Sequence, residues 1–466
     1  SADGPGFGSG NRSLIPAVGT RVGKQSRFWA GVETGQFNHG SIVVERSTPR
    51  SDSETYPLGR RLSTRYPTHE QSVHRRFHMK LALIGVGQAG GKVVEALVAY
   101  DGKTGNKFVT AALAVNTARA DLAGLKLLRD EHRVLIGQAR VKGHGVGADN
   151  ELGAEVMSED VDEVLRALDS VPTHEVDAVL VVAGLGGGTG SGGAPVLAHE
   201  LKRLYTEPVY GLGVLPGTDE GGIYTLNAAR SFQTFVREVD NLIVFDNDAW
   251  RASGESVQGG YATINEELAR RLGVLFSAGE TDGTDVAESV VDASEIINTL
   301  AGGGVSTVGY ASAKLDRTEG GLLSRFGGKK SAAIDDGESL SRIMSVVRRA
   351  TLGRLTLPCE IAGTERALVV VSGPPAYLSR RGIERARTWI EEETGTMEVR
   401  GGDYPVPDSD YVAGVVLLSG VYDVPRIKEL QQIAIEAQRS QEDHQAVAPD
   451  ALDDLLSTDD RLDSLF

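Results

Sequence analysis

Seven of the twelve residues at 184–195 are glycines, in the stretch GLGGGTGSGGAP. The stretch follows an apolar run, VDAVLVVA (176–183), and precedes a helical segment, APVLAHELKRLY (194–205). Glycine weakens any helix or strand because it loses the most chain entropy on folding. A flexible linker does not usually separate a buried strand from a helix, so the cluster favours a loop whose N–H groups approach a ligand closely. The order of strand, glycine loop and helix predicts a binding site for phosphate.

The length and composition limit the class of protein. A chain of 466 residues is too long for one ordinary core, so we expect two domains with tails. No apolar run approaches the roughly 20 residues of a membrane helix, and no secretory signal stands at the start. We therefore expect a cytoplasmic protein without direct membrane insertion. The single cysteine, Cys359, excludes an intramolecular disulfide and is expected to be a buried small residue.

The net charge of −16 is unevenly distributed. Residues 1–78 hold 11 Lys and Arg against 6 Asp and Glu, so the rest of the chain carries all of the excess negative charge. A field of that sign disfavours nucleic acid and anionic membranes as partners. Strong acidity also suits a salt-rich cytoplasm, where repulsion between like charges is screened.

Apolar runs alternate with helical segments after residue 78, which predicts an α/β protein. An amphipathic helix is expected at 260–276, because Ile264, Leu268, Leu272 and Leu275 recur every three or four residues. Expected strands lie before it at 80–84, 110–115, 133–136, 178–183, 209–214 and 241–245, and after it near 305–310, 356–362, 367–372 and 412–418. The pattern predicts a Rossmann-like parallel sheet, a long central helix and a second α+β domain.

The changes in this pattern divide the chain into parts. Residues 1–78 show no sustained apolar period and are expected to be a disordered extension, or upstream sequence from a misassigned start, because Met79 directly precedes the first strand. The parts expected after it are a first domain at 79–258, a central helix at 259–279, a second domain at 280–428 and an acidic C-terminal helix and tail at 429–466. Apolar clusters in that tail fit a short helix on a protein partner, and a merely solvating tail fits equally well.

Two further glycine-bearing stretches follow expected strands, GVGQAG (85–90) and KGHGVGADNELG (142–153). The first matches the dinucleotide-binding pattern G-x-G-x-x-G, but the second strand ends in Asn116 and Thr117, where an acidic residue should hold the ribose. The P-loop pattern G-x-x-x-x-G-K-[ST] is also missed. Three glycine loops at the carboxyl ends of parallel strands predict one ligand site along that edge of the sheet.

In combination, these stretches resemble the tubulin and FtsZ superfamily of polymerising GTPases. GGGTGSG at 186–192 is the signature of that superfamily, GVGQAGG resembles the first glycine loop of tubulin, and AVNTARADL and GADNELG resemble two loops of FtsZ. The resemblance covers about residues 79–425, and the acidic body together with VVDASEIINTL (290–300) is most similar to the CetZ group of haloarchaeal cytoskeletal proteins. It implies the tubulin/FtsZ fold, with GTP bound by the domain at 79–258 and an activation domain at 280–428.

The resemblance implies roles for the residues of the glycine loops in binding GTP or GDP. The phosphate contacts fall on Gly87, Gln88, Ala89, Gly186, Gly187, Gly188, Thr189, Gly190, Ser191 and Gly192, and Asn116 belongs to the same nucleotide site. Asp149 and Asn150 fall near the γ-phosphate and the waters of the Mg²⁺ that accompanies GTP, with no side chain as a direct metal ligand. A simple turn is the alternative for this Asp-Asn pair.

Four other residues are assigned by the resemblance to the nucleoside. Asn247 and Asn265 read the guanine, and Tyr261 stacks on the base. Tyr261 and Asn265 stand four residues apart, so a helix places them on one face. Glu220 is assigned to the ribose. Without the resemblance, Tyr261 would be interpreted as an aromatic residue at the edge of the core.

The expected catalytic residues are Asp292 and Glu295, in a loop that faces the nucleotide of the next subunit in α-tubulin and FtsZ. The pattern D-x-x-E before a helix is also a capping box, which is the structural alternative. The loop departs from the family at Val290, where the family often has asparagine.

The function expected from the resemblance is a GTPase of the cytoskeleton that assembles head to tail into filaments and controls cell shape or division. Its main partner is a second copy of the chain, and its active site is completed by the neighbouring subunit. Two alternatives stay open at this point. One is a dinucleotide-dependent oxidoreductase using GVGQAG, and the other is a nucleotide-binding scaffold that does not polymerise.

Overall fold

The computed structural model describes residues 78–169, 171–250, 257–279, 291–315 and 336–440. The expectations for residues 1–77 and for the tail at 441–466 lie outside the described residues. Within these ranges, no helix combines the length and the apolar character that crossing a membrane requires.

Ten strands of the described residues form one sheet, in the order β3-β2-β1-β4-β5-β6-β7-β10-β8-β9. The strands are β1 (Leu81–Val86), β2 (Val109–Asn116), β3 (Arg133–Leu135), β4 (Ala178–Gly184), β5 (Val209–Leu215), β6 (Asn241–Asp246), β7 (Val305–Lys314), β8 (Arg366–Gly373), β9 (Val399–Pro405) and β10 (Tyr411–Ser419). The first six pair in parallel, as expected, whereas β10 is antiparallel to both of its neighbours. The expected α/β fold, with a parallel first part and a mixed second part, is therefore confirmed.

Strands β1, β5 and β6 are buried at every position, and β4 at all but its last, because helices cover both faces of the sheet. The longer helices are α1 (Gly87–Thr104), α4 (Asn150–Leu168), α5 (Gly188–Leu204), α6 (Gly222–Glu238), α8 (Val257–Ser277), α9 (Ala293–Leu300), α10 (Asp336–Leu352) and α11 (Arg380–Thr394), and the shorter ones are α2 (Arg119–Ala123), α3 (Gln138–Val141) and α7 (Asn247–Trp250). Residues of α4, α5, α6, α10 and α11 share one buried cluster, and residues of α1, α8 and α9 share the other.

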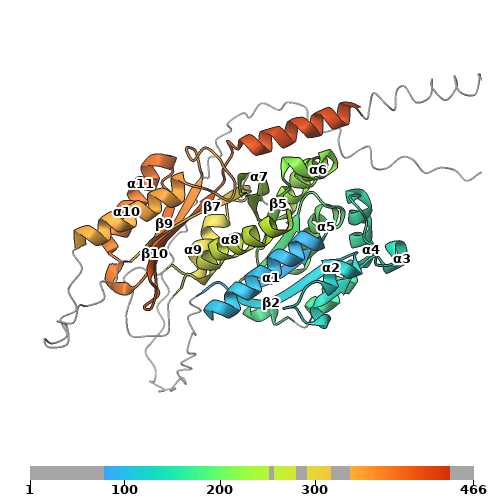
Figure 1. Ribbon diagram of the computed structural model, residues 1–466, viewed down its shortest axis with the longest axis horizontal. Helices are drawn as coiled ribbons and strands as arrows, with labels where there is room; N and C mark the ends of the chain where they lie inside the picture. Colours follow the sequence, from blue (N-terminus) through green and yellow to red (C-terminus); the bar gives the residue numbers. More distant parts are fainter. Residues whose placement is uncertain (1–77, 170, 251–256, 280–290, 316–335, 441–466) are drawn as a thin grey trace, which may run out of the picture. The chain divides into compact units, whose positions relative to one another are not determined.

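The expected helix at 260–276 is confirmed as α8. Its apolar residues Leu268, Leu272 and Leu275 are buried, and it lies beside α1 (Figure 1). The approach of the two helices is close, since a Cβ at Gly273 would lie 2.2 Å from a ring carbon of Tyr100. A final helix occupies 425–440 and follows β10.

A short seam joins the parallel strands to the mixed part of the sheet. β6 and β7 pair through only Leu242 with Val305 and Ile243 with Ser306. The side chain of Asn241, which is fully buried, reinforces the seam. Its amide nitrogen donates to the carbonyls of Leu300 (3.2 Å) and Gly303 (2.9 Å) and to Oγ of Ser419 (3.0 Å), and its oxygen accepts from Oγ of Ser306 (2.7 Å).

Two strand expectations differ from the structure. The strand expected near 356–362 is wrong, because this segment has one backbone bond to β7, from the Thr356 N–H to the Val308 carbonyl (2.9 Å), and no ladder beyond it. Pro358 lacks the N–H that a ladder needs. Conversely, β9 has the sequence VRGGDYP, whose Gly-Gly-Asp core has low strand propensity, and it was not expected.

The first turns of α1, α4 and α5 contact one another directly through backbone atoms, at glycine residues. A Cβ at Gly192 would lie 2.0 Å from the carbonyl oxygen of Asn150, and one at Gly153 would lie 2.3 Å from the carbonyl oxygen of Gly188. Between α1 and α5, a Cβ at Gly87 would lie 2.9 Å from the amide nitrogen of Gly190. Each neighbour is main chain and cannot rotate away, so glycine is required for the helices to pack at this distance.

We expect Gly192→Ala to lower the free energy of unfolding by about 2 kcal/mol or more, because the added methyl group overlaps the backbone of α4. The matched control is Gly102→Ala in α1, where nothing lies within 4 Å of the added carbon. The control should raise stability by about 0.5–1 kcal/mol through helix propensity. Urea unfolding of both variants measures the difference, and equal effects would contradict the packing role of Gly192.

Candidate nucleotide-binding site

The chain reverses its direction of travel across the sheet between β1 and β4. From β1 it proceeds outward to β2 and β3, and from β4 it proceeds the other way to β5 and β6. Ligands of open α/β sheets bind at the carboxyl ends of the strands beside such a reversal. Two of the three glycine loops that the sequence singles out follow these two strands, since α1 begins at Gly87 directly after β1 and α5 begins at Gly188 shortly after β4. The expectation that they share one edge is met.

Three helix N-termini converge at this edge. Besides the contact of Gly87 with Gly190, a Cβ at Gly188 would lie 2.7 Å from the carbonyl oxygens of Gly147 and Asp149, which immediately precede α4. Among the described residues, no side chain caps α1 or α5, so the first N–H groups of these helices remain available to a ligand. Helix N-termini carry a partial positive charge. The arrangement can therefore bind an anion with backbone groups alone.

The glycines of the 186–192 run lie in two different environments. Gly188, Gly190 and Gly192 are buried against backbone, and they serve the packing of the helices. Gly187 is exposed, and no atom of the described residues lies within 4 Å of a Cβ built on it. The sequence interpretation assigned the whole run to close approach of a ligand. In the structure, Gly187 is the glycine of this run whose missing side chain leaves open space beside the helix N-termini.

Side chains tie the loops to one another. The hydroxyls of Thr117 and Thr189 lie 2.7 Å apart, which joins the end of β2 to α5. The amide of Asn227, on α6, donates to the carbonyls of Ala148 (2.7 Å) and Gly186 (3.0 Å). Asn227 is buried and was not identified from the sequence, where a single asparagine in an amphipathic helix carries no recognisable signal.

The remaining expected phosphate-side residues lie at this edge with differing surroundings. Gln88 and Ala89 are exposed in the first turn of α1. Asp149 caps α4 by accepting from the Leu152 N–H (2.9 Å), and Asn150 is the first residue of that helix. Asn116 is buried at the end of β2, and both ends of its amide are used locally, by the carboxylate of Asp121 (3.2 Å) and the N–H of Ala118 (3.1 Å).

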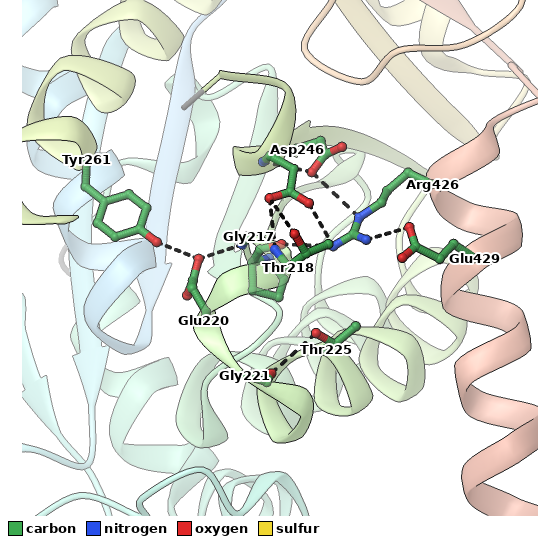
Figure 2. Close-up of polar contacts among 11 residues, drawn as sticks. Gly217, Thr218, Glu220, Gly221, Thr225, Asp246, Tyr261, Arg426 and Glu429 are labelled. Atoms are coloured by element: carbon green, nitrogen blue, oxygen red, sulfur yellow. Dashed lines mark hydrogen bonds and ion pairs between the residues drawn. The ribbon is translucent and has the colours of Figure 1, made fainter. Parts of the chain in front are cut away.

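The expected nucleoside side is built from the ends of β5 and β6 and from α8. Glu220 ends the short 3₁₀ helix η3 (Thr218–Glu220), which follows β5. Its Oε1 accepts from the hydroxyl of Tyr261 (2.5 Å) and from the N–H of Gly217 (2.6 Å), as Figure 2 shows. The structure thus brings Glu220 and Tyr261 together, although they lie on different elements.

Asn247 begins α7 directly after β6, and its side chain is buried. Its amide oxygen has no hydrogen-bond partner among the described residues. A buried acceptor without a donor is costly, so this oxygen is suited to a ligand that supplies an N–H. Asn265 lies one turn after Tyr261 on α8 and is partly buried.

A buried arginine that the sequence did not single out lies behind this side of the site (Figure 2). Arg426, in the first turn of the helix at 425–440, is 7% exposed. Its guanidinium donates to the Pro216 carbonyl (3.1 Å) and to Glu429 (2.6 Å) and lies 3.8 Å from both Asp246 and Asp248. Burial raises the pKa of Asp246 to about 6, opposed by the charge of Arg426. At neutral pH the carboxylate is therefore largely ionised, opposite the arginine.

The expected catalytic residues lie on a different flank of the sheet. Asp292 caps α9 by accepting from the Glu295 N–H (3.1 Å), which is one of the two bonds of the capping box that the structural alternative predicted. The side chain of Glu295 forms an ion pair with Arg400 of β9 (3.3 Å). α9 packs against β8 and β9, so these acids are not brought to the loops after β1 and β4 within one chain.

Cys359 is partly buried, and burial raises the pKa of its thiol to about 12. The thiol is protonated at neutral pH and lacks the reactivity of a thiolate, which supports the interpretation of Cys359 as a structural residue.

Comparison with known proteins gives two adjoining family matches. Residues 80–255 match the GTPase domain of the Tubulin/FtsZ family, and residues 254–436 match the C-terminal domain of tubulin-like CetZ proteins. Among curated proteins, the tubulin-like protein CetZ3 of Haloferax volcanii is 71% identical over 390 residues, which cover 83% of this chain and 100% of CetZ3. CetZ1 of the same organism is 70% identical over 366 residues, covering 77% of this chain and 93% of CetZ1.

Solved structures agree with these matches. CetZ1 from Haloferax volcanii as a GDP-bound monomer is similar with a TM-score of 0.70 and 67% identity, covering 77% of this chain and 100% of that one. CetZ2 from the same organism in a GTPγS-bound protofilament gives a TM-score of 0.69 and 48% identity, covering 78% and 100%. The resemblance inferred from the glycine loops is thereby confirmed, and the chain belongs to the CetZ group of the tubulin/FtsZ family.

Proposed function

We propose that this protein binds GTP and hydrolyses it while assembling head to tail into cytoskeletal filaments. The observation that carries the proposal is the open space at Gly187, where three helix N-termini converge. The buried oxygen of Asn247, which has no hydrogen-bond partner among the described residues, supports it separately from the end of β6. Two relatives are described with guanine nucleotides, CetZ1 with GDP and CetZ2 with GTPγS in a protofilament. The dinucleotide-dependent alternative is set aside, because the family is one of GTPases and Asn116 stands where that motif needs an acid.

The phosphate groups would lie on the N–H groups of the first turns of α1 and α5. Backbone donors and helix dipoles stabilise anions without a lysine. The loop at 186–192 contains no lysine, which agrees with this mode of binding. Mg²⁺ would accompany the γ-phosphate near Asp149 and Asn150, held by the nucleotide and water. A hard cation with its own waters needs few protein ligands.

Guanine fits the acceptor at Asn247 better than adenine does. Guanine presents N–H donors at the edge where adenine presents an unprotonated ring nitrogen. The buried oxygen of Asn247 can accept from the former and faces an acceptor in the latter. Tyr261 would stack on the base, Asn265 would bond its edge and Glu220 would hold the ribose. Glu220 already orients the Tyr261 hydroxyl at 2.5 Å.

Hydrolysis would require a second subunit. Asp292 and Glu295 lie on α9, away from the chain's own phosphate loops, so they would act on the nucleotide of a neighbour. Glu295 would polarise the attacking water, and catalysis would rest on positioning and electrostatics. Because the two contacting faces of a subunit differ, a chain of subunits keeps one unpaired face at each end. Further subunits can therefore add, and an open filament forms. Such a filament is suited to controlling cell shape or division.

Gly187→Val should weaken nucleotide binding strongly with little loss of stability. The added side chain enters open space and the backbone at Gly187 is extended, with φ −75° and ψ 170°, so the fold tolerates it. We expect the affinity for GDP, measured by calorimetry, to fall by at least about 100-fold while the unfolding free energy changes by about 1 kcal/mol or less. Retained affinity would mean that the phosphates do not lie at this loop.

Asn247→Ala should weaken GTP binding by about 1–3 kcal/mol, because it removes a buried hydrogen bond to the base. ATP, measured in parallel, should lose less. The ratio of the two dissociation constants is the decisive quantity. Equal losses for both nucleotides would make Asn247 a structural residue and leave base recognition to other groups.

Glu295→Gln separates a catalytic role from the ion pair with Arg400. The variant should bind GTP and assemble by light scattering at molar salt, but its hydrolysis rate should fall sharply and its filaments should persist. Arg400→Gln breaks the same ion pair and leaves the carboxylate intact, so it is the matched control and should keep most of the activity.

The shared site makes a further demand on the wild-type protein. Hydrolysis per subunit should rise with concentration across the assembly threshold, since each active site needs two chains. A hydrolysis rate per subunit that stays flat across the threshold would contradict the shared site.

For the variant pair, equal losses of hydrolysis in Glu295→Gln and Arg400→Gln would mean that Glu295 serves only as the ion-pair partner of Arg400.

A further inference from the structure

One planar peptide group lies between Arg426 and Glu220. The carbonyl oxygen of Pro216 accepts from the Arg426 guanidinium at 3.1 Å, and the N–H of the same peptide, on Gly217, donates to Glu220 at 2.6 Å. Because a peptide group is rigid and planar, its two polar ends turn together. The bond from Arg426 to the Pro216 carbonyl therefore also fixes the orientation of the Gly217 N–H that donates to Glu220.

The same arginine restrains the loop through a second path. Asp248 accepts from the N–H of Thr218 at 2.9 Å and lies 3.8 Å from the Arg426 guanidinium. Asp248 is in turn joined to Asp246, whose carboxylate accepts from the Asp248 N–H at 3.2 Å. The loop from Pro216 to Glu220 is thus bound on two sides to one buried cation (Figure 2).

That cation belongs to a distant part of the chain. Arg426 lies in the first turn of the helix at 425–440 and is separated from Pro216 by 210 positions. Its own helix holds it through Glu429 at 2.6 Å. A displacement of this helix start would withdraw the guanidinium from the Pro216 carbonyl and release the peptide. Water cannot easily replace the lost bond, because the arginine is 7% exposed.

We propose that Arg426 is a positioning residue for the nucleotide: it orients the Pro216–Gly217 peptide, and through it Glu220 and Tyr261, so that the start of the helix at 425–440 and the ribose side of the site are coupled. This rests on the proposed binding of GTP and GDP. Arg426 itself lies behind the loop, bonded to its backbone. The coupling runs both ways, because a helix that favours nucleotide binding is itself stabilised by nucleotide.

The first test uses the wild-type protein and hydrogen–deuterium exchange. GDP should slow exchange at 216–221 and also at the start of the 425–440 helix. Protection of the loop without any change at the helix start would overturn the coupling while leaving the proposed function intact. Failure to bind GDP at all, measured separately by calorimetry, would overturn the proposed function and this inference with it.

The second test is Arg426→Lys, which keeps the charge and loses the planar fork that reaches several acceptors. The readout is the ratio of affinities for GDP and 2′,3′-dideoxy-GDP, which lacks the hydroxyls assigned to Glu220. We expect wild type to prefer GDP by about 10-fold, roughly the worth of one charge-assisted hydrogen bond, and Arg426→Lys to lose most of that preference. A lower melting temperature with an unchanged preference would reduce Arg426 to a structural residue.

A double-mutant cycle with Glu220→Gln tests whether the two residues act in series. If they do, Arg426→Lys should add little to the loss in GDP affinity caused by Glu220→Gln, whereas independent residues give losses that multiply. The matched control is Arg439→Gln, which changes an exposed arginine farther along the same helix. It should leave the affinity for GDP and the preference for GDP over 2′,3′-dideoxy-GDP unchanged. The proposal would be overturned if the losses of GDP affinity in the two single variants multiplied in the double variant. It would also be overturned if Arg439→Gln had the same effect as Arg426→Lys. If Arg426→Lys does not fold, the exchange experiment on wild type decides alone.

Discussion

The side-chain-free contact between the first turns of α1, α4 and α5 is the constraint on which the rest of the architecture depends. Gly87, Gly153, Gly188 and Gly192 let three helix backbones approach to distances that no other residue permits. Close packing brings three partial positive charges to one edge of the sheet. The residues that allow the fold to close are thus the same ones that bring the helix N-termini together at the proposed anion-binding surface. Gly187 lies just outside the contact, so a substitution there is expected to affect nucleotide binding without disturbing the packing of the helices.

Much of the fold was predictable from the sequence because its signals are local. The buried parallel strands read as continuous apolar runs, and α8 repeats apolar residues every three or four positions from Ile264 to Leu275. The errors arose where a local signal was misleading. The segment at 356–362 is apolar but contains Pro358, and it contacts β7 mainly through Thr307 and Thr356 hydroxyls. β9 pairs along its whole length despite Gly-Gly-Asp, because β8 and the helix α11 supply the packing that its own residues lack.

The candidate site divides in the same way. The position of the loops proposed to bind phosphate could be predicted, since glycine loops at strand ends have a recognisable pattern and the carboxyl ends of parallel strands meet at one edge. Asn227 and Arg426 could not, because each is a lone polar residue whose partners are distant in the chain. The sequence also could not divide the glycines into those that pack and those that face open space. That division depends on the distance between helices, which no single segment encodes.

The seam between β6 and β7 has a consequence for how the sheet can deform. The strands share only two paired positions there, which by itself would make the seam compliant. Asn241 changes this, because its one buried amide bonds to β7, to β10 and to the end of α9. Bending at the seam breaks several of these bonds at once, and the dry surroundings offer nothing in exchange. The seam is therefore expected to resist small bending and to give way only when several of these hydrogen bonds break together.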